Sequence, residues 1–198
     1  MKLSSIFLRA ALALALACST ALASAGPQYH VSVDTQSLAG QSGYLYFLFL
    51  GLVNAAPATA TLSNFSGDFG AGVVTSGDAA GDVAGQLTLG NGSAWTEFAQ
   101  WAHFGGLFGF DVAFEVASGS GAGTTLSVAL LDADFGYLPA TAGDVVTFAL
   151  LPGQDAVVTA DAGFAAVNEV TTVPEPSSAW LGAAGLLLMG GALRRRHP

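Results

Sequence analysis

Leu107-Phe-Gly-Phe-Asp-Val-Ala-Phe-Glu-Val116 is the segment of this sequence whose side chains alternate most regularly. Every second residue from Phe108 onward is large and apolar, and the residues between them are small or acidic. A period of two over this length is typical of an antiparallel strand with one face on a core and the other in water. The segment therefore predicts a sheet whose inner face is buried.

Similar runs lie on both sides of this segment, separated by closely spaced glycines that mark turns. Tyr44 to Leu50 is apolar without a break, which predicts a strand buried on both faces. Ser93 to Phe104 fits either a helix or a strand, and its neighbours favour a strand. Asp78 and Asp82 fall in a glycine-rich stretch that predicts an acidic turn. We expect about nine or ten short strands, forming an all-β antiparallel sandwich of jelly-roll type.

The first 25 residues have the composition of a secretory signal peptide. Lys2 and Arg9 flank its start, and residues 10–17 contain only alanine and leucine. These features predict a signal-peptide helix over residues 1–25, recognised by the secretory translocon and cleaved after Ala23 or Ala25. Cys18 leaves one alternative, a lipoprotein in which this cysteine becomes the new N-terminus.

The predicted domain, residues 26–172, contains no lysine, arginine, methionine or cysteine. Of the 14 acidic residues only Glu175 lies outside it, so its formal charge is −13 with neutral histidines. Binding to a nucleic acid or to an anionic membrane surface needs cations, which excludes both partners for the domain. Without a cysteine, disulfide and thiol chemistry are excluded as well. Apolar burial and backbone hydrogen bonds must therefore stabilise the domain.

The end of the chain has three parts in a fixed order. Pro174, Glu175 and Pro176 come first, and the two prolines cannot lie inside a helix. Residues 178–193 then carry no charge and predict a transmembrane helix about 24 Å long, short of a hydrocarbon core of about 30 Å. Arg194, Arg195 and Arg196 follow and mark the cytoplasmic end.

These three parts, residues 173–198, together resemble the PEP-CTERM sorting signal of Gram-negative bacteria. The resemblance implies processing by exosortase, a membrane-embedded cysteine transpeptidase. Pro174, Glu175 and Pro176 would be the recognition element, and residues 194–196 the cytoplasmic stop. The resemblance also implies an inner-membrane intermediate, a later location at the cell surface or in the extracellular matrix, and an association with exopolysaccharide and biofilm.

The domain offers few residues suited to catalysis, so no catalytic residue is predicted. His30 lies on the polar face of a strand, as expected for a solvated side chain. His103 lies between aromatic residues, as expected for a packed, hydrogen-bonded ring. No spacing singles out two acids for glycoside hydrolysis, which makes a two-acid glycan hydrolase the least favoured of three hypotheses.

Ligand-binding candidates are more numerous. Asp132 and Asp134 alternate in a loop as Ca²⁺ ligands do, but Gly143 stands where a twelve-residue calcium loop has a glutamate. Loop aspartates more often start turns, and this interpretation is favoured over a Ca²⁺ site. No other cofactor is expected. Exposed aromatic rings stack on sugars, and the candidates are Trp95, Trp101 and Tyr137. We therefore expect a non-enzymatic structural or adhesion protein, with a carbohydrate-binding module, assisted by Ca²⁺, as the alternative.

Overall fold

The structure is a computed structural model that describes residues 27–138, 141 and 143–170. The predicted signal peptide with Cys18, Ala23 and Ala25 lies outside these residues. So do the predicted transmembrane helix and the motif residues on either side of it, Pro174 to Pro176 and Arg194 to Arg196. Within the described residues, no helix has the length and apolar character needed to cross a membrane.

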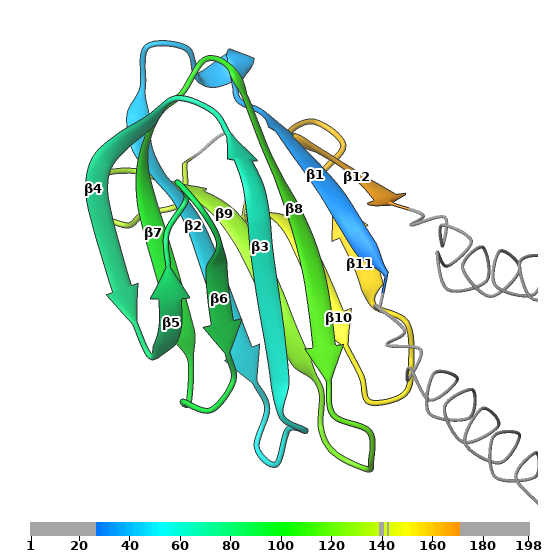
Figure 1. Ribbon diagram of the computed structural model, residues 1–198. Coiled ribbons are helices and arrows are strands. Elements are labelled where there is room, and N and C mark those ends of the chain that lie inside the picture. Colours follow the sequence, from blue (N-terminus) through cyan, green and yellow to red (C-terminus); the bar gives the residue numbers. More distant parts are fainter. Residues whose placement is uncertain (1–26, 139–140, 142, 171–198) are drawn as a thin grey trace, which may run out of the picture.

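Two six-stranded antiparallel sheets make up the described part of the chain, as Figure 1 shows. The all-β prediction is confirmed, and the described residues contain one short 3₁₀-helix and no α-helix. The elements are β1 (Gln28–Asp34), η1 (Gln36–Leu38), β2 (Ser42–Gly51), β3 (Ala58–Ser66), β4 (Phe69–Ser76), β5 (Asp78–Gly81), β6 (Leu87–Gly90), β7 (Thr96–His103), β8 (Leu107–Val116), β9 (Thr124–Leu131), β10 (Asp144–Leu150), β11 (Val157–Ala160) and β12 (Ala165–Val170).

The strand order is β12-β1-β8-β3-β6-β5 in the first sheet, called sheet A here, and β11-β10-β9-β2-β7-β4 in the second, sheet B. The alternating segment from Leu107 to Val116 is β8, between β1 and β3 in sheet A. Its apolar residues Phe108, Phe110 and Val112 are buried, as the period of two predicts.

Side chains from both sheets share one core, in which aromatic rings predominate. Phe47 of β2 and Phe110 of β8 meet edge to face, with ring centroids 5.2 Å apart and an interplanar angle of 81°. Tyr29 and Phe148 make a second contact between the sheets, with centroids 5.3 Å apart. The charged pairs found among the described residues are two His–Asp contacts, since no lysine or arginine lies in this part of the chain. Apolar packing therefore holds the sheets together.

Strand β2 is not buried on both faces, so that prediction is wrong. Leu45, Phe47 and Phe49 point into the core, whereas Tyr44 and Tyr46 on the outer face are half-buried. The segment is apolar on both faces because the outer face of β2 carries aromatic side chains. A loop packs on this outer face, and no further sheet covers it. This uncovered aromatic face lies at the candidate site.

The described residues form twelve strands, more than the nine or ten expected. The predicted acidic turn at Asp78 is instead β5, which pairs with β6. The ambiguous segment from Ser93 to Phe104 contains β7, so the strand interpretation is confirmed. β5 has only four residues, and their side chains are small and mostly exposed. It therefore lacks the alternation of apolar residues from which a strand is predicted.

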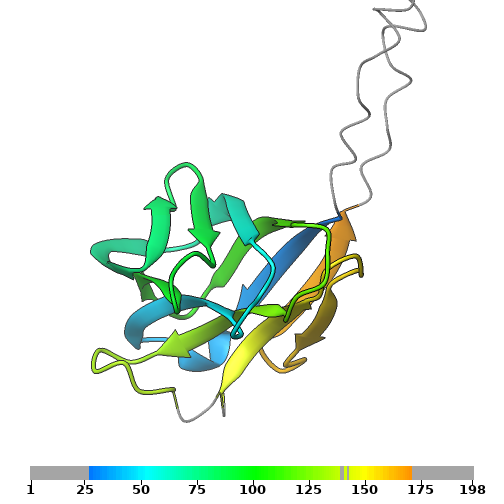
Figure 2. The same ribbon diagram turned by 90° about the horizontal axis from the view of Figure 1, so that it is seen from below.

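The first and last strands lie side by side at one edge of sheet A. β1 and β12 are antiparallel, and Gln28 pairs with Val170. The two ends of the described chain therefore leave the domain at the same corner, as Figure 2 shows. The loop between β9 and β10 lies on the opposite side of the domain in this view.

Candidate functional site

The outer face of sheet B carries a groove of about 500 Å³. Its walls come from β2, β4, β7, the end of β9 and the loop that follows β9. It is lined by Tyr46, Leu48, Val74, Glu97, Leu131, Phe135 and Tyr137.

The strand register explains why there is a hollow at this place. Tyr46 lies between Ala99 of β7 and Ala129 of β9, its direct neighbours on the two adjoining strands. Directly opposite residues on one sheet face fill the space between them, and alanine leaves much of it empty. Glu97 lies opposite Leu48, which places a carboxylate at the wall of an otherwise apolar groove.

The loop after β9 forms the other wall and is held by one carboxylate. Asp132 Oδ1 accepts hydrogen bonds from the backbone N–H groups of Asp134 (2.9 Å) and Gly136 (2.8 Å). Phe135 then has a φ of 64°, in a region that a bulky side chain rarely adopts. Its ring stacks on Tyr44, with centroids 4.6 Å apart and planes 19° apart. The loop thus places an aromatic ring over the sheet at the cost of local backbone strain.

Trp101 extends the aromatic surface beside the groove. Its ring meets Tyr44 edge to face, with centroids 5.0 Å apart. A Cβ at Gly70 of β4 would lie 2.6 Å from Trp101 Cδ1, and one at Gly72 would lie 3.1 Å from Trp101 Cβ. The irregular start of β4 therefore needs these glycines to admit the indole. The buried Gln100 amide donates to the Gly70 carbonyl (2.5 Å) and secures this part of the strand.

Two tyrosine hydroxyl groups donate to carboxylates in the groove. The Tyr46 hydroxyl donates to Glu97 Oε2 (2.8 Å), and the Tyr137 hydroxyl donates to Asp144 Oδ1 (3.1 Å). Burial raises the pKa of Tyr46, and its hydrogen bond to Glu97 and the charge of that residue raise it further. Burial, then the charge of Asp144 and the hydrogen bond to it, raise the pKa of Tyr137. Both hydroxyl groups therefore keep their protons at neutral pH.

A second site of interest is the polar outer face of sheet A. His30 Nδ1 lies 2.6 Å from Asp111 Oδ1, and the Asn64 amide donates to Asp111 Oδ2 (2.7 Å). Burial acts to raise the pKa of Asp111, but hydrogen bonds from Asn64 and His30 and the His30 charge hold it below its ordinary value. Ser66 lies over Gly109 beside the His30 ring, yet no hydrogen bond joins Ser66 to His30 in the described structure. The His30–Asp111 pair therefore has no hydrogen bond to a nucleophilic hydroxyl group, which a catalytic triad requires.

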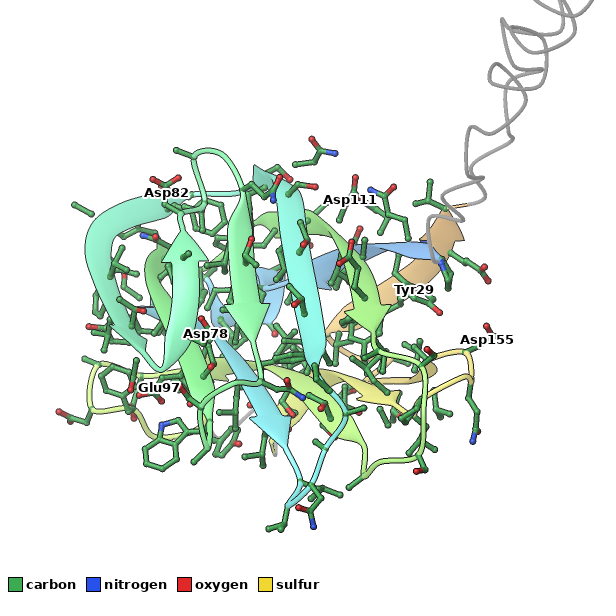
Figure 3. The ribbon with its side chains drawn as sticks, turned by 60° about the horizontal axis from the view of Figure 1, so that its bottom comes forward. Tyr29, Asp78, Asp82, Glu97, Asp111 and Asp155 are labelled. Atoms are coloured by element: carbon green, nitrogen blue, oxygen red, sulfur yellow. The ribbon has the colours of Figure 1, made fainter. Side chains whose placement is uncertain are left out.

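A larger cavity, about 810 Å³, lies at another part of sheet A. Asp78 and Glu115 stand at its two sides, with Thr59 and Gly90 on the strands between them. The side chain of Asn91 also lines it, but its amide already binds Ala58, Ala56 and Thr124. Figure 3 shows the labelled acids Asp82, Glu97, Asp111 and Asp155 spread around the domain. The smaller groove on sheet B, with its exposed rings, is the better candidate for recognition.

The comparisons with known proteins concern the end of the chain. Residues 172–196 match the family model described as the PEP-CTERM protein-sorting motif. The chain carries a PEP-CTERM sorting signal. No curated protein and no solved structure matches the chain.

The PEP-CTERM signal marks an exported protein of a Gram-negative bacterium that is processed by exosortase. The match includes Pro174 to Pro176 and Arg194 to Arg196, the residues that carry the resemblance in the sequence. It does not extend into the described domain, so the domain's role must be argued from its own residues.

The structure brings together only some of the residues predicted to bind a ligand in this chain. Trp101 and Tyr137 belong to the aromatic face of sheet B, as expected for sugar-stacking residues. Trp95 is 52% exposed but precedes β7, about 20 Å of extended chain from Trp101. Sequence reasoning missed Tyr46 and Phe135. The alternation of Tyr44 and Tyr46 with core residues was the sequence signal from which Tyr46 could have been predicted to lie on the outer face.

The predicted calcium ligands have a different role in the structure. Asp132 is committed to the backbone of its own loop, and only Asp134 remains beside it. Among the described residues, no group of three His, Cys, Asp or Glu side chains converges as metal ligands would. His103 is half-exposed, so the prediction of a packed ring is wrong, but its ring is hydrogen-bonded as predicted, to Asp68 at 3.3 Å. His30 is exposed as predicted, although it is paired with Asp111.

Proposed function

We propose that this exported protein has a non-enzymatic structural or adhesion role at the cell surface or in the extracellular matrix, in contact with biofilm exopolysaccharide. The observation that carries this proposal is the aromatic groove on the outer face of sheet B. Phe135 and Tyr137, which line it, are 44% and 53% exposed. Aromatic rings with a polar edge are the side chains that commonly stack on sugars and form interfaces.

The place of the groove also suits an adhesive role. The chain ends leave the domain at the β1–β12 edge, whereas the loop carrying Phe135 lies on the opposite side. In the proposed sequence of events, the sorting tail holds the protein briefly in the inner membrane before exosortase processing. The groove would then face away from the point of attachment.

A non-enzymatic role is favoured by the state of the acids and histidines. In the groove, Glu97 and Asp144 each accept a tyrosine hydroxyl. The two histidines of the domain sit on exposed surface, each beside an aspartate. Catalysis by a general base requires such a group near a bound substrate, and neither histidine lines the groove.

The alternative is a dedicated carbohydrate-binding module, assisted by Ca²⁺ at Asp132 and Asp134. It is favoured by the same aromatic face and by the position of Asp132 at the base of the loop that carries Phe135. A calcium-dependent module would lose its polysaccharide on addition of a chelator. The adhesion proposal without Ca²⁺ expects no such loss.

The test of binding compares two tryptophans in the full chain. Trp101→Ala removes the half-buried indole that meets Tyr44 edge to face, and Trp95→Ala removes the more exposed indole that precedes β7. Co-sedimentation with purified exopolysaccharide should fall about tenfold for Trp101→Ala, the value of one stacked ring, and stay unchanged for Trp95→Ala. Equal retention of both variants would refute a polysaccharide site at this groove.

The test of sorting replaces Pro174, Glu175 and Pro176 with alanines in cells that contain exosortase. The unprocessed chain should accumulate in the inner membrane. Ser177→Ala/Ser178→Ala is the control and should be processed normally. Normal processing of the triple variant would contradict the assigned role of the motif.

We also propose that the domain is a β-sandwich of jelly-roll type. Three nested pairs support this: β1 with β8, β2 with β7, and β3 with β6. Folding one long hairpin over itself produces such nested pairs, as in a jelly roll. β5 departs from the pattern because it pairs with β6 and not with β4.

A further inference from the structure

We propose that the groove on sheet B selects a positively charged sugar, the ammonium group of an amino sugar without its acetyl group. This inference rests on the polysaccharide-binding role proposed above and names the chemistry of the sugar. It follows from three features of the groove: its hydrogen-bonding groups, its aromatic rings and the charge around it.

The polar groups of the groove act as acceptors towards a ligand. The hydroxyl protons of Tyr46 and Tyr137 already point to Glu97 and Asp144. The second carboxylate oxygen of each acid and the lone pairs of each tyrosine hydroxyl remain free to accept hydrogen bonds from a ligand. None of the residues lining the groove is a lysine, arginine, histidine, asparagine or glutamine. A ligand must therefore donate hydrogen bonds, and an ammonium group donates three.

The aromatic rings favour a cation for a second reason. A cation near a ring face is attracted by the quadrupole of the ring, most strongly by tryptophan and tyrosine. Tyr46, Phe135 and Tyr137 line the groove, and Tyr44 and Trp101 adjoin it through ring contacts. Carboxylates beside aromatic rings are the combination that binds an organic ammonium group. A neutral sugar would use only the rings.

The charge of the whole domain acts in the same direction. Thirteen acids without lysine or arginine repel an anionic polysaccharide before it reaches the groove, and attract a cationic one. The groove itself contributes Glu97, with Asp144 beside it. An acidic surface alone would bind any cation weakly. The aromatic rings that line the groove provide the selection for a ring-shaped ligand with an ammonium group.

The experiment measures binding of two tetramers of equal length to the full chain in mild detergent. One is β-1,4-linked glucosamine and the other is its N-acetylated form, which lacks the charge. By isothermal titration calorimetry, the free-amine tetramer should bind about tenfold more tightly, and added salt should reduce the difference. Equal affinities, both lost in Trp101→Ala, would overturn the inference and leave the polysaccharide site intact. Binding of neither tetramer would overturn both.

Two charge variants separate the groove from general attraction to an acidic protein. Glu97→Gln keeps the size of the side chain and should lower the affinity for the free-amine tetramer about tenfold. Glu169→Gln on β12 removes the same charge at an edge of sheet A and should change nothing. Equal losses in both variants would overturn the inference. Asp144→Asn, on an exposed side chain, should also weaken binding and serves if Glu97→Gln lowers the melting temperature.

A basic peptide is the competing source of ammonium groups. At mildly acidic pH, where the amines of the glucosamine tetramer are protonated, tetralysine has the same net charge without the sugar rings. It should bind at least tenfold more weakly than the glucosamine tetramer. Binding as tight as that of the glucosamine tetramer would overturn the assignment to a sugar.

Discussion

The contact between Phe47 and Phe110 provides a direct test of the two-sheet core. The two rings come from different sheets, both side chains are completely buried, and they meet edge to face at 5.2 Å. Replacing each by leucine, singly and together, removes the ring contact while leaving apolar side chains of similar volume. The comparison of the four proteins isolates the energy of this one contact.

The expected magnitudes follow from burial and ring geometry. Each single change should lower the free energy of unfolding by about 1–1.5 kcal/mol, because leucine refills most of the space. An edge-to-face pair at this distance is worth about 0.5–1.5 kcal/mol beyond its buried area. The double variant should therefore lose less than the sum of the single losses, by that amount.

Urea unfolding followed by tryptophan fluorescence measures all four proteins, and the slopes should agree. Phe148 is the control partner, because its ring contacts are with Tyr29 and Phe114 and not with Phe47. The losses of Phe47→Leu and Phe148→Leu should add within about 0.5 kcal/mol. A coupling of zero between Phe47 and Phe110 would refute the packing of β2 against β8.

Three further outcomes follow from the groove and the outer faces. Gly70→Ala places a methyl group against Trp101, and should reduce polysaccharide binding several-fold while the domain stays folded. Glu97→Gln removes an acceptor and a charge, so the pKa of Tyr46 should fall towards its ordinary 10.0, as measured by ultraviolet absorbance during alkaline titration. A raised folded pKa contributes stability that is complete below pH 10.0 and is lost as the pH rises through the folded value. The pKa of Asp111 lies below its ordinary 3.8, so the stability that it contributes is present above pH 3.8 and is lost as the pH falls through the folded value. Urea midpoints measured from about pH 5 to about pH 2 should show this loss, and Asp111→Asn should remove it.

Each of these outcomes has a matched control. Gly106→Ala meets no atom within 4 Å and should leave binding unchanged. Asp82→Asn removes a carboxylate far from Tyr46, and its tyrosine titration should match that of the unmodified chain. If Gly106→Ala weakens binding as much as Gly70→Ala does, the assigned role of Trp101 is wrong. An alkaline titration unaltered in Glu97→Gln would contradict the hydrogen bond to Tyr46.

Sequence patterns predicted the strands best where burial on one face imposes a period of two. The segment from Leu107 to Val116 is β8 with the same bounds. The period fails where both faces carry apolar residues, as in β2, because hydrophobicity alone does not distinguish a core from an uncovered aromatic face. Asp78 to Gly81 shows neither pattern, because β5 is held by pairing with β6 and not by burial.

The candidate site was harder to predict because it depends on register. Tyr46 faces two alanines that lie far from it in sequence, and only strand pairing brings them together. Phe135 reaches the sheet through a backbone conformation that its residue type disfavours. Tyr137 and Trp101 were predicted because exposed aromatics suggest stacking. Trp95 met the same criterion, and the structure places it elsewhere.

The pairing of the first strand with the last has a mechanical consequence for the proposed surface role. β12 is an edge strand held by β1, with Val170 opposite Gln28 at the corner where the chain leaves the domain. Any tension transmitted through the C-terminal attachment acts first on this one pair of strands. If β12 is pulled away, the exposed backbone of β1 becomes a free edge to which a strand of another chain can add. In the proposed surface role, drag on an attached cell or fibre would then turn the domain into a template for joining its neighbours.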